Sequence, residues 1–289
     1  MKKYAILCCL LAAVFCLLMG CFSPWAGDEG TITISLGGSG NARALNFNSS
    51  FLDNPSLFSL LEHHITLTGP SGTINHTANG AGTVKIAVPP GLWNVKVETF
   101  CYGMQFAVGT PASIDVKAGQ SNAVSVEMED GDTIFYAVSD IITDNCYDWY
   151  NFVSMTESIG NHCAILVDDI LVDIDNYWSP PFGTVAESIT IIGNNKTITL
   201  TTASGTTGSL FSVEGSTDNN QTVTIKDLHI EGFSGNNSPL VVVENNGIFI
   251  IQGNSSLSGN SAGALDIRVG GTAIIDGTSW DPGIYYTVP

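Results

Sequence analysis

The sequence predicts an all-β protein, with an antiparallel β-sandwich over residues 31–129 and a short parallel β-helix over residues 189–289. In the first region, short segments of alternating apolar and polar residues are separated by turn residues, which is typical of strands with one face toward water. In the second region, similar strand-like segments recur at a nearly constant spacing, as expected when each repeat forms one coil of a solenoid. Three to four such coils fit into this region.

Seven segments of the sandwich region have the length and composition of strands. The alternation is clearest where Val84, Ile86 and Val88 point to one side while Lys85 and Ala87 point to the other. About seven strands in a region of this length are typical of a β-sandwich. The segments are Thr31–Leu36, Ile65–Thr68, Thr83–Val88, Leu92–Thr99, Met104–Val108, Ser113–Val116 and Ala123–Met128.

Two runs in this region resemble the prealbumin-like sandwich modules of secreted bacterial proteins. The runs are AVPPGLWNVKVET, residues 87–99, and IDVKAGQSNAVSVEM, residues 114–128. In those modules a Pro-Gly turn precedes a strand of a hairpin, and a final strand closes the sheet. Pro89 and Pro90 can lie only in a turn, because two successive prolines remove hydrogen-bond donors from a sheet. The resemblance implies the sandwich fold and little about function.

Three pairs of segments carry the repeat in the C-terminal region. We expect Ile and Val to stack inside each coil and Gly, Asn and Ser to occupy its corners, since Gly adopts positive φ freely and Asn tolerates it. Two pairs share one offset along the chain: Asn246–Ser255 with Gly270–Ser279, and Ser234–Asn236 with Ser258–Asn260. The third pair, Thr197–Leu200 with Thr222–Ile225, has an offset that is only slightly longer.

Residues 130–188 are predicted to form a linker and the N-terminal cap of the β-helix. The run DNCYDWYNFVSMTESIG, residues 144–160, is aromatic and compatible with a helix, and an apolar run and SITIIGNNKTITL, residues 188–200, follow it. This order resembles the N-terminal entry of right-handed parallel β-helices of the pectate-lyase-like superfamily, in which a helix covers the open end of the coil. The resemblance implies a right-handed β-helix with a small helical N-cap. The segment Asp281–Tyr286 is expected to cover the opposite end.

Residues 1–20 have the pattern of a secretory signal peptide. Lys2 and Lys3 form a positive N-terminal region, and the run from Tyr4 to Met19 is almost wholly apolar. A membrane-spanning helix needs about 20 apolar residues, so this run is short for a permanent anchor.

The end of this segment, Leu18-Met19-Gly20-Cys21, resembles the lipobox of bacterial lipoproteins. The resemblance implies cleavage between Gly20 and Cys21, a diacylglycerol on the Cys21 sulfur and acylation of the new amine. Two or three acyl chains hold a protein stably to a bilayer, whereas one chain does not. Residues 21–30 then form a short tether. The alternative is an ordinary signal peptide followed by a chance cysteine.

The chain is strongly acidic, with 9 basic and 27 acidic side chains and a net charge of −18. This balance excludes nucleic-acid binding through a basic face, because the phosphates would be repelled. Removal of residues 1–20 takes away two lysines and no acidic residue, which leaves a charge of −20. Anionic lipid headgroups repel such a chain, so we expect the acyl chains on Cys21 to hold it to the membrane.

The residue after Cys21 bears on the location within the cell envelope. An aspartate there retains many bacterial lipoproteins in the inner membrane, and the residue here is Phe22. The sequence therefore favours the outer membrane over the inner one. It leaves open whether the folded part faces the periplasm or the cell exterior.

Three cysteines remain in addition to Cys21 and those of the signal segment. An odd number leaves at least one of Cys101, Cys146 and Cys163 unpaired within the chain, so disulfides do not organise the fold. A bridge between Cys146 and Cys163 is one alternative. The spacing of cysteines and histidines does not indicate a zinc site.

An acidic run offers a candidate for weak calcium binding. Asp168, Asp169, Asp173 and Asp175 are spaced so that their oxygens could reach one Ca²⁺ ion. The run lacks the pattern of a calcium-binding loop with its bidentate glutamate, and Asp173 and Asp175 alternate as strand residues do. A solvated acidic face is the preferred interpretation, and no metal ligand or cofactor is predicted.

The adjacent residues His63 and His64 are a second candidate metal pair. Neighbouring residues of a strand point to opposite faces of a sheet, so their imidazoles do not share one ion easily. We expect one half-buried and one exposed histidine.

Enzymatic chemistry requires a convergent set of residues, and the sequence does not predict one. Arg268 and Asp266 lie on the same face of an expected strand and are interpreted as an exposed ion pair of small energetic effect. The other acidic residues of the β-helix are expected to be scattered over solvated faces; they are Glu214, Glu231, Glu244 and Asp276. No catalytic residue is therefore assigned.

Taken together, the sequence predicts a membrane-anchored envelope lipoprotein that binds or displays without catalysis. The expected ligand is a carbohydrate or a protein surface, because the predicted β-helix is acidic and faced by Asn, Ser and Thr. No nucleophile elbow, phosphate loop or dinucleotide fingerprint is present in the sequence. A polysaccharide lyase or hydrolase is one alternative, and a structural envelope protein that binds another protein is a second.

Overall fold

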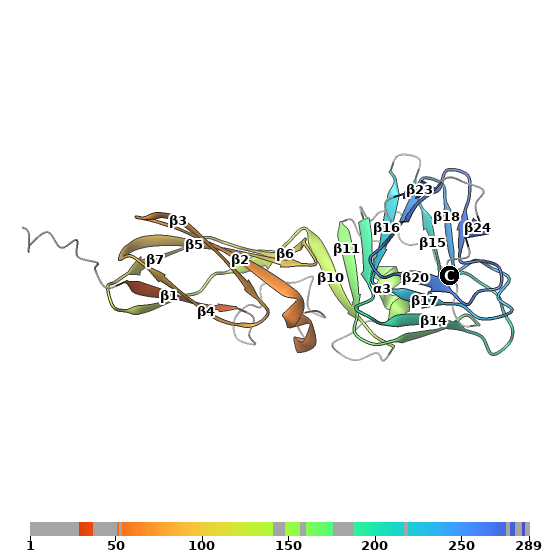
Figure 1. Ribbon diagram of the computed structural model, residues 1–289, viewed down its shortest axis with the longest axis horizontal. Helices are drawn as coiled ribbons and strands as arrows, with labels where there is room; N and C mark the ends of the chain where they lie inside the picture. Colours follow the sequence, from red (N-terminus) through yellow and green to blue (C-terminus); the bar gives the residue numbers. More distant parts are fainter. Residues whose placement is uncertain are drawn as a thin grey trace, which may run out of the picture.

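The computed structural model describes residues 29–36, 51, 54–140, 148–156, 160–175, 188–216, 219–275, 278–280 and 285–286. Its regular structure is nearly all β, with antiparallel sheets in the N-terminal part and a parallel β-solenoid of about four turns in the C-terminal part. The two parts follow one another along the long axis of the molecule (Figure 1). The predicted fold class is therefore confirmed.

The N-terminal part is a sandwich of two sheets. One sheet has the order β4-β1-β8, and the other has the order β3-β2-β5-β6-β9, with β7 also paired to β5. One pair departs from the expected antiparallel arrangement, because β1 and β8 are parallel. The strands are β1 (Gly30–Leu36), β2 (Leu61–Gly69), β3 (Gly72–Asn79), β4 (Gly82–Val88), β5 (Gly91–Cys101), β6 (Met104–Gly109), β7 (Ala112–Val116), β8 (Ser121–Val124) and β9 (Met128–Asp130).

The sandwich core follows the predicted alternation. Ile86 and Val88 are buried while Lys85 and Ala87 are exposed. The largest side chain of this core belongs to Trp93, whose indole Nε1 donates a hydrogen bond of 2.9 Å to the Pro89 carbonyl in the predicted turn.

Gly69 on β2 allows the backbone to approach the Trp93 ring closely. A Cβ atom at Gly69 would lie 2.3 Å from the indole, which is shorter than any real carbon contact. The turn at Pro89 and the glycine at position 69 together hold the ring in the core.

The C-terminal part winds three parallel sheets around one apolar core. The first solenoid sheet has the order β10-β11-β13-β16-β19-β22-β23, the second β12-β14-β17-β20, and the third β15-β18-β21-β24. The first-sheet strands are β10 (Thr133–Val138), β11 (Asn161–Leu166), β13 (Ser188–Ile192), β16 (Gln221–Lys226), β19 (Gly247–Gln252), β22 (Thr272–Ile275) and β23 (Thr278–Trp280). The others are β12 (Ile170–Asp173), β14 (Thr197–Thr201), β17 (His229–Glu231), β20 (Ser256–Ser258), β15 (Phe211–Glu214), β18 (Val241–Glu244), β21 (Leu265–Ile267) and β24 (Tyr285–Tyr286).

The predicted repeat is correct only for the last coil. Ile248 pairs with Thr272, which is the register expected from the predicted alignment of residues 246–255 with 270–279. Thr197–Leu200 and Thr222–Ile225 were expected to occupy equivalent places, and this expectation is wrong because they lie in different sheets, on β14 and β16. Strands β14 and β16 share an alternation of Thr with Ile, Val or Leu, so a short match between them does not show that they belong to the same sheet.

The predicted alignment of Ser234–Asn236 with Ser258–Asn260 is also wrong. Ser258 pairs with Glu231, not with Ser234. Parallel pairing already begins at β10, where Thr133 faces Asn161, earlier than the start predicted at residue 189. The first coils therefore lie within the region expected to be a linker.

The two ends of the solenoid carry different elements, and residues 281–284 of the segment expected to cover the C-terminal end lie outside the described residues. The predicted cap helix is present as α3 (Trp149–Met155), which begins after Asp148, whose side chain accepts a hydrogen bond from the Asn151 amide. Trp149 and Phe152 pack into the solenoid core, with their ring centroids 5.8 Å apart. At the other end, β23 and β24 pair antiparallel with β22 and β21 and thereby occupy two of the sheet edges.

The sandwich and the solenoid share a buried apolar cluster, which we call the junction core. It joins the η1 helix (Pro55–Leu60) and the ends of β2, β5 and β6 to the outer face of β10, β11 and β13. The Phe106 ring lies 4.9 Å from Phe51 and 5.3 Å from Phe135, measured between centroids. Its buried members are Phe51, Leu57, Leu61, Cys101, Phe106, Ala107, Phe135, Ala137, Cys163, Ile165 and Ile192.

Candidate functional site

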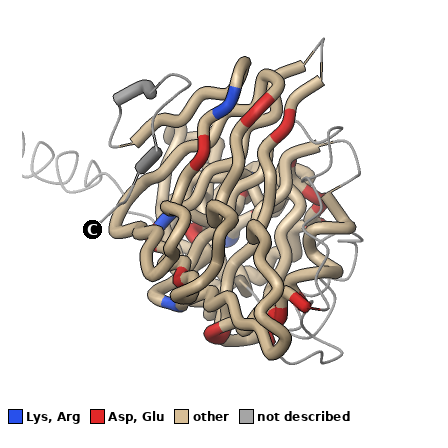
Figure 2. The backbone as a smooth tube through the Cα atoms, turned by 90° about the vertical axis from the view of Figure 1, so that its right-hand side faces the viewer, with Lys and Arg blue, Asp and Glu red and all other residues tan. Residues whose placement is uncertain are grey.

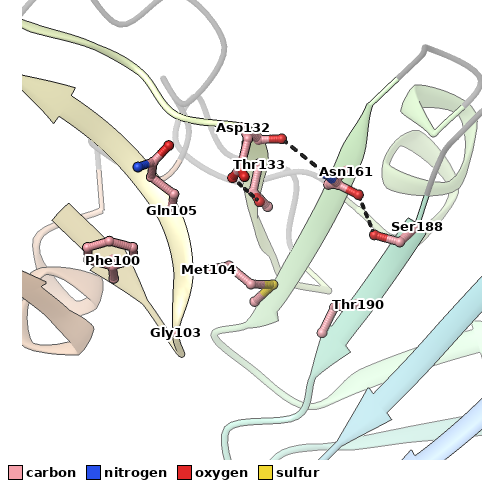
Figure 3. A pocket seen from close by; sticks show the side chains of 9 residues that line it. All are labelled: Phe100, Gly103, Met104, Gln105, Asp132, Thr133, Asn161, Ser188 and Thr190. Atoms are coloured by element: carbon pink, nitrogen blue, oxygen red, sulfur yellow. Dashed lines mark hydrogen bonds between the residues drawn. The ribbon is translucent and has the colours of Figure 1, made fainter. Parts of the chain in front are cut away.

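A cleft of about 500 Å³ lies beside the junction core, between the sandwich and the first solenoid sheet. One wall comes from the β5–β6 hairpin, and the other comes from the outer face of β11 and β13 (Figure 3). We call it the junction cleft. Its lining residues are Phe100, Gly103, Met104, Gln105, Asp132, Thr133, Asn161, Ser188 and Thr190.

A chain of hydrogen bonds fixes the polar wall of the cleft. The Ser188 hydroxyl donates to Asn161 Oδ1 at 2.6 Å, and Asn161 Nδ2 donates to the Asp132 carbonyl at 3.4 Å (Figure 3). The Thr133 hydroxyl donates to Asp132 Oδ1 at 3.1 Å. Because Asn161 and Ser188 are paired rungs of neighbouring parallel strands, the backbone register sets their spacing.

The hairpin wall is more apolar, and a contact at its tip links it to the solenoid. Phe100 and Met104 line this wall (Figure 3). Tyr102, at the turn, has a φ of 52°, and Lys226 Nζ of β16 lies 5.3 Å from the centroid of its ring. Partial burial raises the pKa of the Tyr102 hydroxyl, and the nearby Cys101 and Asp227 raise it further. The contact holds the hairpin over the sheet.

The lining is almost uncharged. Asp132 is the single ionisable residue among the nine that line the cleft. The other polar groups are the amides of Gln105 and Asn161 and the hydroxyls of Thr133, Ser188 and Thr190, which can both donate and accept hydrogen bonds. Such a lining suits a neutral ligand with many hydroxyl groups.

The four aspartates considered for calcium do not form a metal site. Within the residues that the structure describes, no group of three or more His, Cys, Asp or Glu side chains is placed to hold a metal ion. Asp169 Oδ1 accepts a hydrogen bond of 2.8 Å from the Thr197 amide, and Asp173 Oδ1 accepts one of 3.1 Å from the Asp175 amide. Asp168 is exposed.

Asp175 has a structural role between coils. Its Oδ2 accepts hydrogen bonds of 2.7 Å from the amides of Ala203 and Ser204 in the next coil. Hydrogen bonds from the Ser204 and Thr206 side chains hold the pKa of the Asp175 carboxyl well below its usual range. Three of the four carboxylates of this run therefore accept hydrogen bonds from backbone amides of the chain, and weak calcium binding stays an untested candidate.

The two adjacent histidines lie on opposite faces of β2, as predicted. His63 is buried, with Nδ1 2.9 Å from Thr99 Oγ1 and Nε2 3.1 Å from the Gly80 carbonyl. Burial lowers the pKa of His63, although the hydrogen bond with Gly80 opposes this effect. His64 is exposed and pairs with Glu62.

Arg268 forms the predicted ion pair and a second one that the sequence did not indicate. Its Nε lies 2.9 Å from Asp266 Oδ2, and its Nη1 lies 3.0 Å from Glu244 Oε2. Glu214 faces Glu244 in the register of β15 and β18, and its Oε1 accepts a hydrogen bond of 2.7 Å from Asn245. Glu214 and Glu244 were expected to be scattered, whereas the coil stacking brings them together with Asp266 on the third solenoid sheet.

The charged positions of the solenoid can be followed along the backbone in the end-on view (Figure 2). Figure 2 shows more acidic than basic positions along the described backbone of that view. This distribution agrees with the net charge of −18.

The cysteines of the described residues are free. Cys101 and Cys163 are both unpaired and buried in the junction core, so the Cys146–Cys163 bridge considered above is not formed. Burial raises the pKa of Cys101 to about 12 and also raises that of Cys163, which makes both thiols poor nucleophiles. Cys146 lies outside the described residues, as do Gly20 and Cys21 of the predicted lipobox.

Comparison with known proteins gives no match: no family model matches the chain, and neither does any curated protein or solved structure. Among the described residues, no helix is long and apolar enough to cross a membrane. The lipobox interpretation therefore stays a prediction from the sequence.

Sequence reasoning did not find the junction cleft. Its residues come from five strands and the turns beside them, and together they form no motif in the sequence. One signal was present: Asn161 and Ser188 are polar residues at the first positions of strands that are mostly apolar.

Proposed function

We propose that this chain is a lipid-anchored protein of the bacterial envelope that binds a neutral carbohydrate in the junction cleft without converting it. The observation that carries the proposal is the lining of the cleft. The Asn161 amide and several hydroxyls on the solenoid wall face a mainly apolar hairpin wall that also carries the Gln105 amide, and Asp132 is the single carboxylate of the lining.

Carbohydrates present two kinds of surface to a protein. Their hydroxyl groups need donors and acceptors at fixed positions, and Asn161, Ser188 and Thr190 provide these on rigid strands. Their C–H faces pack on apolar side chains, for which Phe100 and Met104 are available. A cleft of about 500 Å³ is within the usual size range of small-ligand sites.

The cleft favours binding over cleavage. Hydrolysis of a glycosidic bond generally needs two carboxyl groups on either side of that bond. Asp132 is the one carboxylate of the lining, and its Oδ1 already accepts a hydrogen bond from Thr133.

The anchor is supported by the segment Leu18-Met19-Gly20-Cys21. Two or three acyl chains on Cys21 would hold the acidic chain to the outer membrane in spite of its repulsion from anionic headgroups. Labelling of cells with radioactive palmitate tests this part of the proposal. We expect the wild-type chain to be labelled and Cys21→Ala to be unlabelled, and an unlabelled wild type would refute the anchor.

A glycan array with neutral and acidic glycans tests the cleft, followed by calorimetric titration of the best ligand. Gln105→Ala removes one neutral hydrogen-bonding group, so we expect affinity to fall about three- to tenfold. Thr190→Arg fills the cleft and should abolish binding. Thr199→Arg places the same side chain on the outer face of β14, in the second solenoid sheet, and should leave the affinity unchanged.

Two results would contradict this assignment. Equal binding by wild type and Thr190→Arg would place the ligand elsewhere. Absence of any glycan ligand, together with a protein partner recovered by crosslinking in membranes, would favour a structural envelope protein.

One observation supports the alternative that the chain is a polysaccharide-active enzyme, and it concerns the carboxylates of the third solenoid sheet. Glu214 and Glu244 face the same side on neighbouring rungs, with Arg268 beside them. Incubation with acidic polysaccharides and calcium, monitored for unsaturated ends by ultraviolet absorbance and for reducing ends, tests this second candidate. Activity that is lost in both Glu214→Gln and Glu244→Gln would establish it, and absence of activity would exclude these substrates.

A further inference from the structure

Strand β3 forms one edge of the larger sandwich sheet. It pairs with β2 in one unbroken antiparallel register from Gly72 to Asn79, and no other described strand pairs with it. Its residues are exposed or half-exposed along its whole length. In Figure 1 it lies at the outer margin of the sandwich. Its second edge therefore presents a row of backbone donors and acceptors.

This edge lacks the features that usually prevent strands from pairing with other chains. Natural edge strands are short, bulged, or carry charges or proline. Strand β3 has eight residues, GTINHTAN, without Asp, Glu, Lys, Arg or Pro. The other sandwich edges are protected: β4 contains Lys85, β7 contains Asp115, β9 has three residues including Glu129 and Asp130, and β8 has four residues.

On the core-facing side of the larger sheet, the apolar side chains of the last strand, β3, are only partly covered. Leu67 and Ile65 of β2 are fully buried, and they face Ile74 and His76 of β3. Ile74 and Ala78 pack against the sandwich core but are only partly buried. A further strand beside β3 would cover these two side chains.

We propose that β3 is a homodimer interface, in which two copies of this chain pair antiparallel through their β3 strands. The chain carries a net charge of −18, so two copies repel one another over most of their surface. An uncharged strand is the place where they can approach at the least electrostatic cost. Isologous pairing of one strand with its own copy also closes the assembly at two chains.

The side chains select one register. Pairing centred on His76 places Ile74 opposite Ala78 of the second copy, twice by symmetry, and pairs the polar residues Asn75 and Thr77 on the other face. Pairing centred on Asn75 instead places Ile74 opposite His76 and Ala78 opposite Gly72. The first register buries both apolar side chains, so it is the one we assign.

The test is sedimentation velocity over a range of protein concentrations. The chain from Phe22 onward contains every described strand and helix, so it can be studied without residues 1–21. We expect the wild type to shift from monomer to dimer with concentration. His76→Lys and His76→Glu each place like charges directly opposite one another, and each should weaken dimerisation about tenfold or more.

Two further samples make the test specific. An equimolar mixture of His76→Lys and His76→Glu should recover the dimer, because the two charges then face each other. Thr83→Lys adds the same charge to the exposed face of the β4 edge and should dimerise like the wild type. Circular dichroism and thermal unfolding check that each variant is folded.

A wild type that stays monomeric at all concentrations would overturn the proposal, as would a His76→Lys variant that dimerises normally. Failure of the mixture to recover the dimer would overturn the register centred on His76. None of these results depends on whether the junction cleft binds carbohydrate.

Discussion

The first solenoid sheet has two parts that differ in what lies on their outer face. In β11, five of the six residues are buried, whereas in β16 buried and half-buried residues alternate. The outward residues Cys163 and Ile165 of β11 belong to the junction core, whereas the outward residues Thr222 and Thr224 of β16 are polar, half-buried and not part of that core. In the first solenoid sheet, a run of buried residues therefore marks the strand that the sandwich covers, and alternation marks the strand whose outer face is more open.

The largest expected effect comes from a side chain on the covered part. Phe135 of β10 is fully buried, with its ring 5.7 Å from Phe51 and 5.3 Å from Phe106. Phe135→Ala should lower the free energy of unfolding by about 3–5 kcal/mol, because a large aromatic cavity is left. Thr222→Ala on the open part should change it by less than about 0.5 kcal/mol. Chemical denaturation of both variants measures the difference, and equal effects would contradict the comparison.

The second expected effect concerns the hydrogen bonds that the Asp175 carboxylate accepts from the next coil. Its pKa is lower in the folded chain than in the unfolded chain, where a carboxyl titrates near pH 4. The stabilisation is therefore complete above about pH 4 and is lost as the pH falls below that value. Asp175→Asn should lower the melting temperature at neutral pH and flatten its dependence on pH in the acid range. Thermal unfolding across pH checks this.

A matched variant separates a specific from a general charge effect. Asp168→Asn removes the same charge from an exposed position of the same acidic run. It should leave both the melting temperature and its acid dependence close to wild type. An equal response of the two variants would mean that overall charge, and not the hydrogen bonds to Ala203 and Ser204, controls the acid range.

The smallest expected effect concerns the place in the first solenoid sheet where the part covered by the sandwich meets the more open part. Tyr102→Ala removes the ring beside Lys226 and should lower the free energy of unfolding by about 0.5–1 kcal/mol. Tyr102→Phe keeps the ring and should behave like wild type. A loss in Tyr102→Phe as well would assign the effect to the hydroxyl and not to the contact with Lys226.

Several elements of the fold could be predicted because their signals are local. Alternation in Val84–Val88, two prolines at 89 and 90, and the aromatic run around Trp149 predicted a strand, its end and the cap helix, and the structure contains β4, the break between β4 and β5, and α3. Strand β3 was missed because only Ile74 and Ala78 of its eight residues are apolar and pack toward the core, which is too few to give a detectable apolar period. The coil register was predicted in part, since strands of different sheets share one pattern.

The candidate site was not predictable in the same way. Phe100, Gln105, Asn161 and Ser188 have no motif among them, and they meet only because the sandwich packs on the outer face of the solenoid. The ion pair of Arg268 with Asp266, two positions away on the same strand, was predicted. Its ion pair with Glu244 of the preceding coil was not predicted. Neighbours along a strand can be read from spacing, whereas neighbours across coils depend on the number of residues in each turn.

The sequence by itself determined that the chain is all β, that it divides into a sandwich and a solenoid, and that both have polar outer faces. These properties follow from periodicity and turn residues, which act over a few neighbouring positions. Only the tertiary structure decided which strands are covered twice, where the junction cleft opens and which carboxylates meet. Those features depend on contacts between segments far apart in the chain, and such contacts are set by packing that no local pattern encodes.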